Sequence, residues 1–290
     1  MPVFDTPEPI SVTVELGVGN IRIVASDRTD TIVEVRPSNE AKKSDVAAAE
    51  QTRVEYADGR LLIKGPKNWR QFSLRGGRES IDVRIDLPAG SHVRGSSGVA
   101  GFHSTGRLGE VHVATGMGDI HVDQGGDPVE LKTGYGDITV GTVGGHASAK
   151  TGSGAVRMSS IHGTAAVKNA NGDTWIGEVT AELSVQGANG KIVVDKAHST
   201  VGAKTANGDV RLGEVAHGAV RAETAFGKVD VGISEGVTAW LEVSTGFGQV
   251  LNELDATERP DAGKDTVEVR AHTGFGDITI RRAPSMQAAR

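Results

Sequence analysis

The stretch Thr115-Gly-Met-Gly-Asp-Ile-His-Val122 decides the fold, because it returns along the chain at a fixed interval. Close copies are Thr133-Gly-Tyr-Gly-Asp-Ile-Thr-Val140 and Thr273-Gly-Phe-Gly-Asp-Ile-Thr-Ile280. The second glycine of each unit falls at Gly118, Gly136, Gly154, Gly172, Gly190, Gly208, Gly227, Gly248 and Gly276, so the first five intervals are each 18 residues. A fixed period of this length is typical of solenoid proteins, in which each repeat forms one coil.

Aliphatic residues recur at fixed places within each period. Every second residue after the glycine turn is usually aliphatic, in columns that begin at Ile120 and Val122, and the same holds before the turn in columns that begin at Val111 and Val113. This alternation is what a strand with one buried face requires. The sequence therefore predicts an all-β fold, a β-solenoid (β-helix) of about nine 18-residue coils with two short strands per coil, over residues 96–282.

An antiparallel meander is the competing topology, because Asn-Gly pairs such as Asn171-Gly172 are strong hairpin signals. A meander repeats its residues in mirrored pairs, whereas here like residues recur once per period. A threonine column shows this recurrence: Thr115, Thr133, Thr151, Thr205, Thr224, Thr245 and Thr273. The pattern favours the solenoid.

Residues 1–95 have a different pattern and are predicted to form an N-terminal capping region of strands and one short helix. One early copy of the unit, Leu16-Gly-Val-Gly-Asn-Ile-Arg-Ile23, stands here. We expect a helix from about Ser44 to Gln51 and strands at 53–56, 61–64 and 80–87. A cap is expected because the end of a solenoid offers unpaired strand edges. Residues 283–290 are expected to form a C-terminal tail.

The composition excludes several classes of protein. The net charge of −6 argues against binding to nucleic acid, and the absence of cysteine excludes disulfides and thiolate chemistry. No basic segment followed by a long apolar stretch stands at the N-terminus, and no 18 consecutive apolar residues occur. With no signal peptide or transmembrane segment visible, the chain is expected to be cytoplasmic, and a cell-surface role would need another route.

Leu16 to Val24, the segment Ser80 to Leu87 with its following Pro88-Ala89-Gly90, and the Gly-Asp-Ile/Val repeats resemble the bacterial putative-adhesin family of β-strand-repeat proteins, a domain of unknown function. The resemblance covers nearly the whole chain. It implies a β-strand-repeat architecture and a role in surface adhesion or envelope sensing. No catalytic residue is carried over from it.

The residues that could bind a metal or act in catalysis are expected to have structural roles. Asp119, Asp137, Asp173, Asp209 and Asp277 follow turn glycines, but their spacing differs from that of calcium-binding β-roll repeats, and we expect solvent-facing turn residues. Among the histidines, His103 and His121 are expected to stack in one column of neighbouring coils, with His112 on the other strand face. No catalytic residue, metal site or cofactor is predicted, and the protein is not expected to be an enzyme.

Two features are candidate interaction surfaces. The turn residues Phe226, Phe247 and Phe275 recur in the C-terminal coils, and we favour inward packing for them over an outward apolar stripe. A basic loop in this acidic protein carries aromatic residues, as interface hot spots do. The loop residues of interest are Lys67, Trp69, Arg70, Phe72 and Arg75.

The sequence therefore predicts a non-enzymatic scaffold or protein-binding β-solenoid, adhesin-like or self-assembling. The expected partner is another protein, or a second copy that joins the solenoid end at the final strand near Ile278, where only the tail Arg281 to Arg290 follows. The alternative is a carbohydrate-active or carbohydrate-binding β-helix protein.

Overall fold

The structure is a computed structural model that describes residues 1–66, 79–254 and 266–284. The basic loop with Lys67, Trp69, Arg70, Phe72 and Arg75 lies outside the described residues. Contacts divide the chain into two units, Met1–Gly145 and His146–Arg290, and each is considered by itself.

The described part of the first unit contains β1 (Val3–Asp5), β2 (Ser11–Ser26), β3 (Asp30–Pro37), α1 (Lys43–Glu50), β4 (Arg53–Ala57), β5 (Arg60–Lys64), β6 (Ile81–Pro88), β7 (His92–Arg107), β8 (Val111–Met117), β9 (Ile120–Gly125), β10 (Val129–Tyr135) and β11 (Ile138–Val143). The described part of the second contains β12 (Ala147–Ser153), β13 (Val156–Ile161), β14 (Ala165–Asn171), β15 (Thr174–Val179), β16 (Leu183–Asn189), β17 (Ile192–Ala197), β18 (Val201–Asn207), β19 (Val210–Val215), β20 (Gly218–Phe226), β21 (Val229–Ile233), β22 (Thr238–Phe247), β23 (Val250–Asn252), β24 (Thr266–Phe275) and β25 (Ile278–Arg282).

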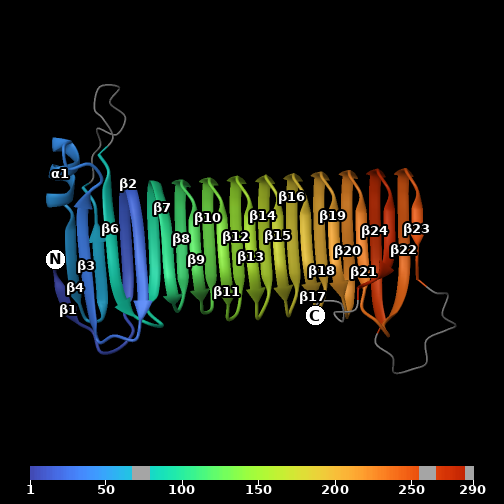
Figure 1. The fold of residues 1–290 in the computed structure, drawn as a ribbon, viewed down its shortest axis with the longest axis horizontal. Helices are drawn as coiled ribbons and strands as arrows, with labels where there is room; N and C mark the ends of the chain where they lie inside the picture. The colour runs from blue at the N-terminus through green and yellow to red at the C-terminus, as the bar shows by residue number, and fades with distance from the viewer. Residues whose placement is uncertain (67–78, 255–265, 285–290) are drawn as a thin grey trace. The chain divides into compact units, whose positions relative to one another are not determined.

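Neighbouring coils pair in parallel with the register of the sequence repeat (Figure 1). In the first unit Val129 of β10 pairs with Val111 of β8, and in the second unit Ala165 of β14 pairs with Ala147 of β12. The solenoid prediction is confirmed, and the antiparallel meander is wrong for the repeat region. The expected apolar columns are buried, with residues such as Ile138 and Val156 at 0% exposure.

The glycine corner of a coil is held by the next coil stacked on it. At Gly118 the backbone N–H donates to the Tyr135 carbonyl (2.8 Å), while the Thr133 hydroxyl donates to the Gly118 carbonyl (3.0 Å). The carboxylate of Asp119 accepts the Asp137 N–H (2.8 Å). The Thr-Gly-x-Gly-Asp unit therefore supplies both sides of a three-bond contact between successive corners.

One coil departs from this pattern and compensates for it. Gly187 stands in the threonine column and has no hydroxyl for the carbonyl of Gly172. Asn169, one coil earlier in the same column, is longer than threonine. Its amide Nδ2 donates both to the Gly154 carbonyl (3.1 Å) and to the Gly172 carbonyl (2.9 Å). The asparagine thus serves two corners.

At the N-terminal end, β2 is itself a coil that pairs in parallel with β7 on one side and with β5 and β6 on the other. Antiparallel strands complete this end, since β4 pairs with β5, β3 pairs with β6, and β1 pairs with β3. The expected short helix is α1, which contacts β3 and β6. Switching to antiparallel strands ends the parallel series of coils.

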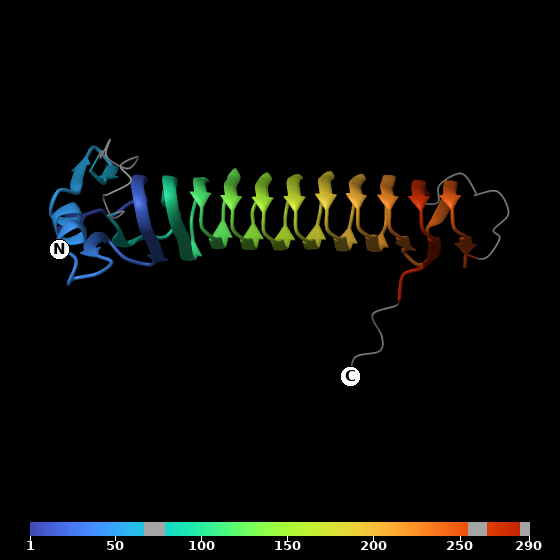
Figure 2. The ribbon, with the colours of Figure 1, turned by 90° about the horizontal axis from the view of Figure 1, so that it is seen from above.

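The C-terminal coils do not follow chain order. β24 pairs with β20 on one side and with β22 on the other, and β25 likewise lies between β21 and β23. Figures 1 and 2 show the orange β22 and β23 beyond the red β24 and β25. The expectation that the final strand near Ile278 forms the end is therefore wrong. The outermost described coil is β22–β23.

Charged side chains fix the last coil in its inserted position. The Arg281 guanidinium makes two bonds to the Asp230 carboxylate, at 2.9 and 3.1 Å, and so joins β25 to β21. Arg282 donates to the carbonyls of Ser234 (3.0 Å) and Val237 (2.8 Å), in the connection that leads out to β22. Paired arginine–carboxylate bonds of this kind are among the stronger polar contacts.

We predict that Gly190→Ala destabilises the protein by about 1–3 kcal/mol, because it introduces both backbone strain and a clash. Gly190 has a φ of +134°, and a Cβ there would lie 2.2 Å from the Gly172 carbonyl oxygen. The control is Gly202→Ala, where the nearest atom to an added Cβ lies at 3.9 Å and the unfolding free energy should not fall. Urea unfolding of both variants measures the difference, and equal losses contradict the role of the corner.

A second prediction concerns the shared asparagine. Asn169→Thr leaves the Gly172 carbonyl without its donor and should cost about 1–3 kcal/mol. Adding Gly187→Thr supplies the missing hydroxyl, so the double variant should recover part of that loss. A double-mutant cycle by denaturant unfolding measures the coupling. Additive losses contradict the proposed sharing.

Candidate functional site

The outermost described coil, β22–β23, exposes residues that are buried elsewhere. Val250 occupies an inward column in which Val229 and Ile278 are at 1% and 0% exposure, yet it is 48% exposed. The exposure of Val250 follows from its position, because no described coil covers the outer side of β22–β23. Leu251 (52% exposed) and Trp240 (58%) stand in outward columns, beside Thr279 and Glu268, and add apolar surface to the same coil. We call this coil, residues 238–252, the open end.

The three turn phenylalanines form a stack along one corner of the second unit. Phe275 lies in the middle, with its ring centroid 5.0 Å from that of Phe226 and 4.8 Å from that of Phe247. The three side chains are 54%, 48% and 69% exposed for Phe226, Phe275 and Phe247 respectively. The favoured inward packing is therefore wrong, and the outward stripe is found.

The physical reason for the outward direction is the bend at the corner. Alternation along the strand would turn the residue two places after the buried Thr273 inward, but the chain turns here into Gly276, whose φ is +148°. The same corner holds a ladder of asparagines in earlier coils. Asn189 donates to Asn171 and Asn207 donates to Asn189, each at 2.8 Å. Stacked side chains of one kind therefore line this corner.

An aspartate fastens the open end to its neighbour. The Asp277 carboxylate accepts the Gln249 N–H at 3.1 Å and lies 3.1 Å from the Lys228 ammonium. The backbone hydrogen bond from Gln249, and then the hydrogen bond and charge of Lys228, lower the pKa of Asp277 below its ordinary value. Asp173 and Asp209 accept the Lys191 and Lys228 N–H groups in the same way, both at 2.9 Å. The turn aspartates thus hold coils together, a role that sequence reasoning missed.

The histidine column is as expected. The rings of His103 and His121 are stacked, with centroids 4.5 Å apart and planes inclined by 12°, and His112 lies on the other strand face beside Glu130. Burial lowers the pKa of His103, and the nearby charges of His121 and Arg22 lower it further. Within the described ranges, no group of three or more histidine, cysteine or acidic residues is arranged to hold a metal ion.

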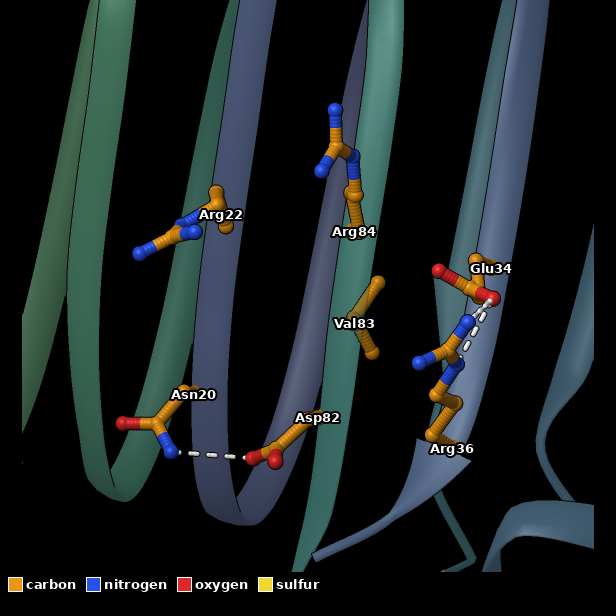
Figure 3. Close-up of a pocket in the computed structure, with 7 residues that line it drawn as sticks. All are labelled: Asn20, Arg22, Glu34, Arg36, Asp82, Val83 and Arg84. Atoms are coloured by element: carbon orange, nitrogen blue, oxygen red, sulfur yellow. Dashed lines mark hydrogen bonds and ion pairs between the residues drawn. The ribbon is translucent and has the colours of Figure 1, made fainter.

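A shallow hollow of about 380 Å³ lies on the outer face of β2, β3 and β6 (Figure 3). Two bonded pairs line it: Asn20 donates to Asp82 at 2.9 Å, and Arg36 donates to Glu34 at 2.6 Å. Arg84 points away from both pairs and lies 3.1 Å from Asp86. Because neighbouring carboxylates already neutralise two of its arginines, this hollow is a weaker candidate than the open end.

The parallel coils, the glycine corners and the terminal strands together cover the region that a family model matches, residues 9–281. The chain belongs to the Toastrack DUF4097 family. Membership agrees with the resemblance to a domain of unknown function that the Gly-Asp-Ile repeats indicated. No curated protein matches the chain.

Solved structures with similarity to this toastrack chain include a putative adhesin from Bacteroides fragilis, at 16% identity and a TM-score of 0.38, covering 97% of this chain and 95% of that one. A putative cell adhesion protein from Clostridium sporogenes has 13% identity and a TM-score of 0.20, covering 97% and 98%. A putative adhesin from Parabacteroides distasonis has 11% identity and a TM-score of 0.26, covering 96% and 95%. At such values the likenesses say nothing about the function of this chain. Its one described helix is too short and too polar to span a membrane.

Sequence reasoning missed the open end itself. The intervals of 21 and 28 residues before Gly248 and Gly276 mark this region as irregular, and an inserted segment from Glu253 to Asp265 follows β23. Neither signal says that the later coil lies inside the earlier one. The sequence alone therefore does not distinguish three residues of this coil from ordinary repeat positions: Trp240, Val250 and Leu251.

We predict that the Asp277 carboxyl titrates below an ordinary aspartate. A carboxyl with a lowered folded-state pKa stabilises the fold above its unfolded pKa, and this stabilisation is lost as the pH falls through the folded value. Attachment of the open end should therefore weaken only in acid, which amide exchange of β22–β23 can follow. Carbon NMR of the aspartate carboxyls gives the titration itself. Lys228→Gln should raise the pKa without restoring the ordinary value, because the Gln249 N–H remains, and an unchanged midpoint contradicts this account.

Proposed function

We propose that this protein is a non-enzymatic, self-associating β-solenoid whose open end joins that of a second copy. The observation that carries the proposal is the exposed coil β22–β23, with Val250 at 48% and Phe247 at 69% exposure. An uncovered strand edge is a template for pairing with another chain, and proteins usually blunt it. No such covering is present among the described residues of the second unit.

A second copy fits this end because a twofold axis can bring two open ends together without leaving an edge. An axis perpendicular to both strand faces would place β22 antiparallel to its copy and β23 antiparallel to its copy. Each strand then gains hydrogen-bond partners, and the aliphatic interiors meet. Twofold contacts of this kind close on themselves, and they are the commonest form of homo-oligomer.

The register follows from the residues of β22. Directly opposite residues in an antiparallel pair point to the same face, so Leu241, Val243 and Thr245 must lie opposite inward residues of the copy. If the two copies of β22 pair over nearly their whole length, only two registers set inward residues opposite inward residues. One is centred on Glu242 and the other on Val243. The first sets two carboxylates against each other, which is unfavourable. The second sets Glu242 opposite Ser244, so we infer a pairing centred on Val243.

The N-terminal strands of the first unit offer a poorer surface for the same role. In the first unit, β3 and β4 already add antiparallel strands beyond β6 and β5, and α1 packs beside β3. An open end that met this surface would form a head-to-tail contact, which continues into filaments rather than closing. The proposal is therefore a dimer through two open ends.

Sedimentation equilibrium over a range of concentrations tests the association. We expect a monomer–dimer equilibrium that stops at the dimer, and Val250→Lys should abolish it, because a charge would enter the shared interior. The control is Val193→Lys, the same change on the outer face of β17, which should leave the dimer intact. A monomer at every concentration, or growth beyond dimers, contradicts the proposal.

The absence of cysteine from the chain allows a direct test of the register. In a pairing centred on Val243, each Val243 lies opposite its own copy, at a Cα separation that suits a disulfide. Val243→Cys should therefore form a covalent dimer on mild oxidation, whereas Val193→Cys should not. Equal cross-linking of the two variants contradicts this register.

A further inference from the structure

The outer face of β12, β14, β16 and β18 carries positive charge only. Its outward residues are Ser148, Lys150, Gly152, Ala166, Lys168, Ala170, Ser184, Gln186, Ala188, Gly202, Lys204 and Ala206. Strand register places Lys150 beside Lys168, Lys168 beside Gln186, and Gln186 beside Lys204. We call these three lysines, together with Gln186 between them, the lysine row. In a chain of net charge −6, a face without one acidic residue is unusual.

The opposite face of the same coils has the mixed charge of an ordinary solvated surface. On β17 and β19, Lys196 pairs with Glu214 at 3.6 Å, and His198 bonds Glu178 of β15 at 2.6 Å. The half-buried Trp175 donates to Asp195 at 3.0 Å. Gln186 and Glu223 stand in the same column as the lysines, so the repeat itself does not impose lysine there. The charge belongs to one face.

The lysine row is unneutralised over most of its length. Lys204 lies 3.0 Å from Glu223 of β20, but Lys150 and Lys168 make no ion pair with any residue that the structure describes. Strands in a sheet lie about 4.8 Å apart, so Lys150 and Lys168 repel each other across one strand spacing. All four side chains are exposed. A row of like charges with this spacing is suited to an extended anion that neutralises several of them together.

The residues beside the row leave it open to a flat ligand. Columns of serine, alanine and glycine flank the lysines on both sides, so no large side chain stands between the ammonium groups and solvent. On the same face, a groove of about 320 Å³ crosses β16, β18, β20 and β24, at residues that precede Gln186 and Lys204 on their strands. Its polar lining residues are Glu182, Ser184, Thr200, Arg221, Glu268 and Arg270. Arg221 pairs with Glu223 and Arg270 pairs with Glu268, so the groove is a mixed polar surface and not a cationic one. Such groups donate to and accept from hydroxyl groups.

We propose that this face, from the lysine row to the groove, binds an acidic polysaccharide laid across the strands, its carboxylates on the lysines and its hydroxyls in the groove. A single-stranded nucleic acid is a poorer fit because bases stack on aromatic side chains, and the outward positions of these four strands carry none. An extended peptide binds by adding a strand to a sheet edge, whereas this surface is a sheet face. The site is independent of the open end.

The test is binding of polygalacturonate oligosaccharides, measured by calorimetry at low salt, with a neutral glucan of similar length as the comparison. The variant is Lys150→Gln, Lys168→Gln and Lys204→Gln together, since Gln186 shows that glutamine fits this column. The control is Arg157→Gln, Lys191→Gln and Arg211→Gln, which changes the net charge equally away from the row. Unchanged melting temperatures establish that both variants are folded.

We expect binding of polygalacturonate that weakens with salt, no binding of the glucan, and affinity about tenfold or more lower in the lysine-row variant. The control variant should bind as the parent does. Failure of polygalacturonate to bind overturns the proposal, and so does an equal loss in the two variants. Binding of polyphosphate or of single-stranded DNA in preference to polygalacturonate also overturns it, because the ligand class is then wrong.

Discussion

The hydrogen bonds at the glycine corner are the contact on which the rest of the structure depends. A coil that reverses direction over a few residues needs a left-handed backbone there, which glycine adopts without strain. The turn would leave the N–H and carbonyl of that glycine unpaired, and unpaired polar groups are costly when buried. The next coil supplies a carbonyl that accepts the glycine N–H, and a threonine hydroxyl that donates to the glycine carbonyl. Each corner is therefore complete only when another coil follows.

This dependence on a following coil matters wherever a series of coils stops, and each of the two units contains one such place. In the first unit, antiparallel strands follow beyond β5 and β6, because β4 pairs with β5 and β3 pairs with β6. The series of parallel coils therefore ends in antiparallel pairs. At the C-terminal end, Gly248 occupies the corner position of β22–β23, and no described coil follows to receive its N–H. Among the described residues, the parallel series ends there without being closed. The proposed self-association surface follows from the same bonds that build the coils.

The two proposed interactions use different properties of the repeat. The proposed contact at the open end depends on backbone groups and on an aliphatic interior that no described residue covers, so it would recognise strand geometry. The lysine row depends on side chains that the repeat leaves free to vary, because outward residues do not affect the interior. A ligand on that face would bind through charged groups that match the spacing of the lysines on neighbouring strands. The open end and the lysine row can therefore change independently.

The sequence by itself determined the coil. The 18-residue period, the alternating aliphatic columns and the Gly-Asp corners predicted parallel strands and a buried interior, because each position in the period meets the same position one coil away. The helix near Ser44 and the stacked histidines at His103 and His121 followed from local pattern in the same way. Only the tertiary structure decided which coil is outermost, because Val250 and Val229 have the same local sequence pattern and differ only in what covers them. It also decided that Phe226, Phe247 and Phe275 point outward, since a corner bend removes the strand alternation on which the inward prediction relied.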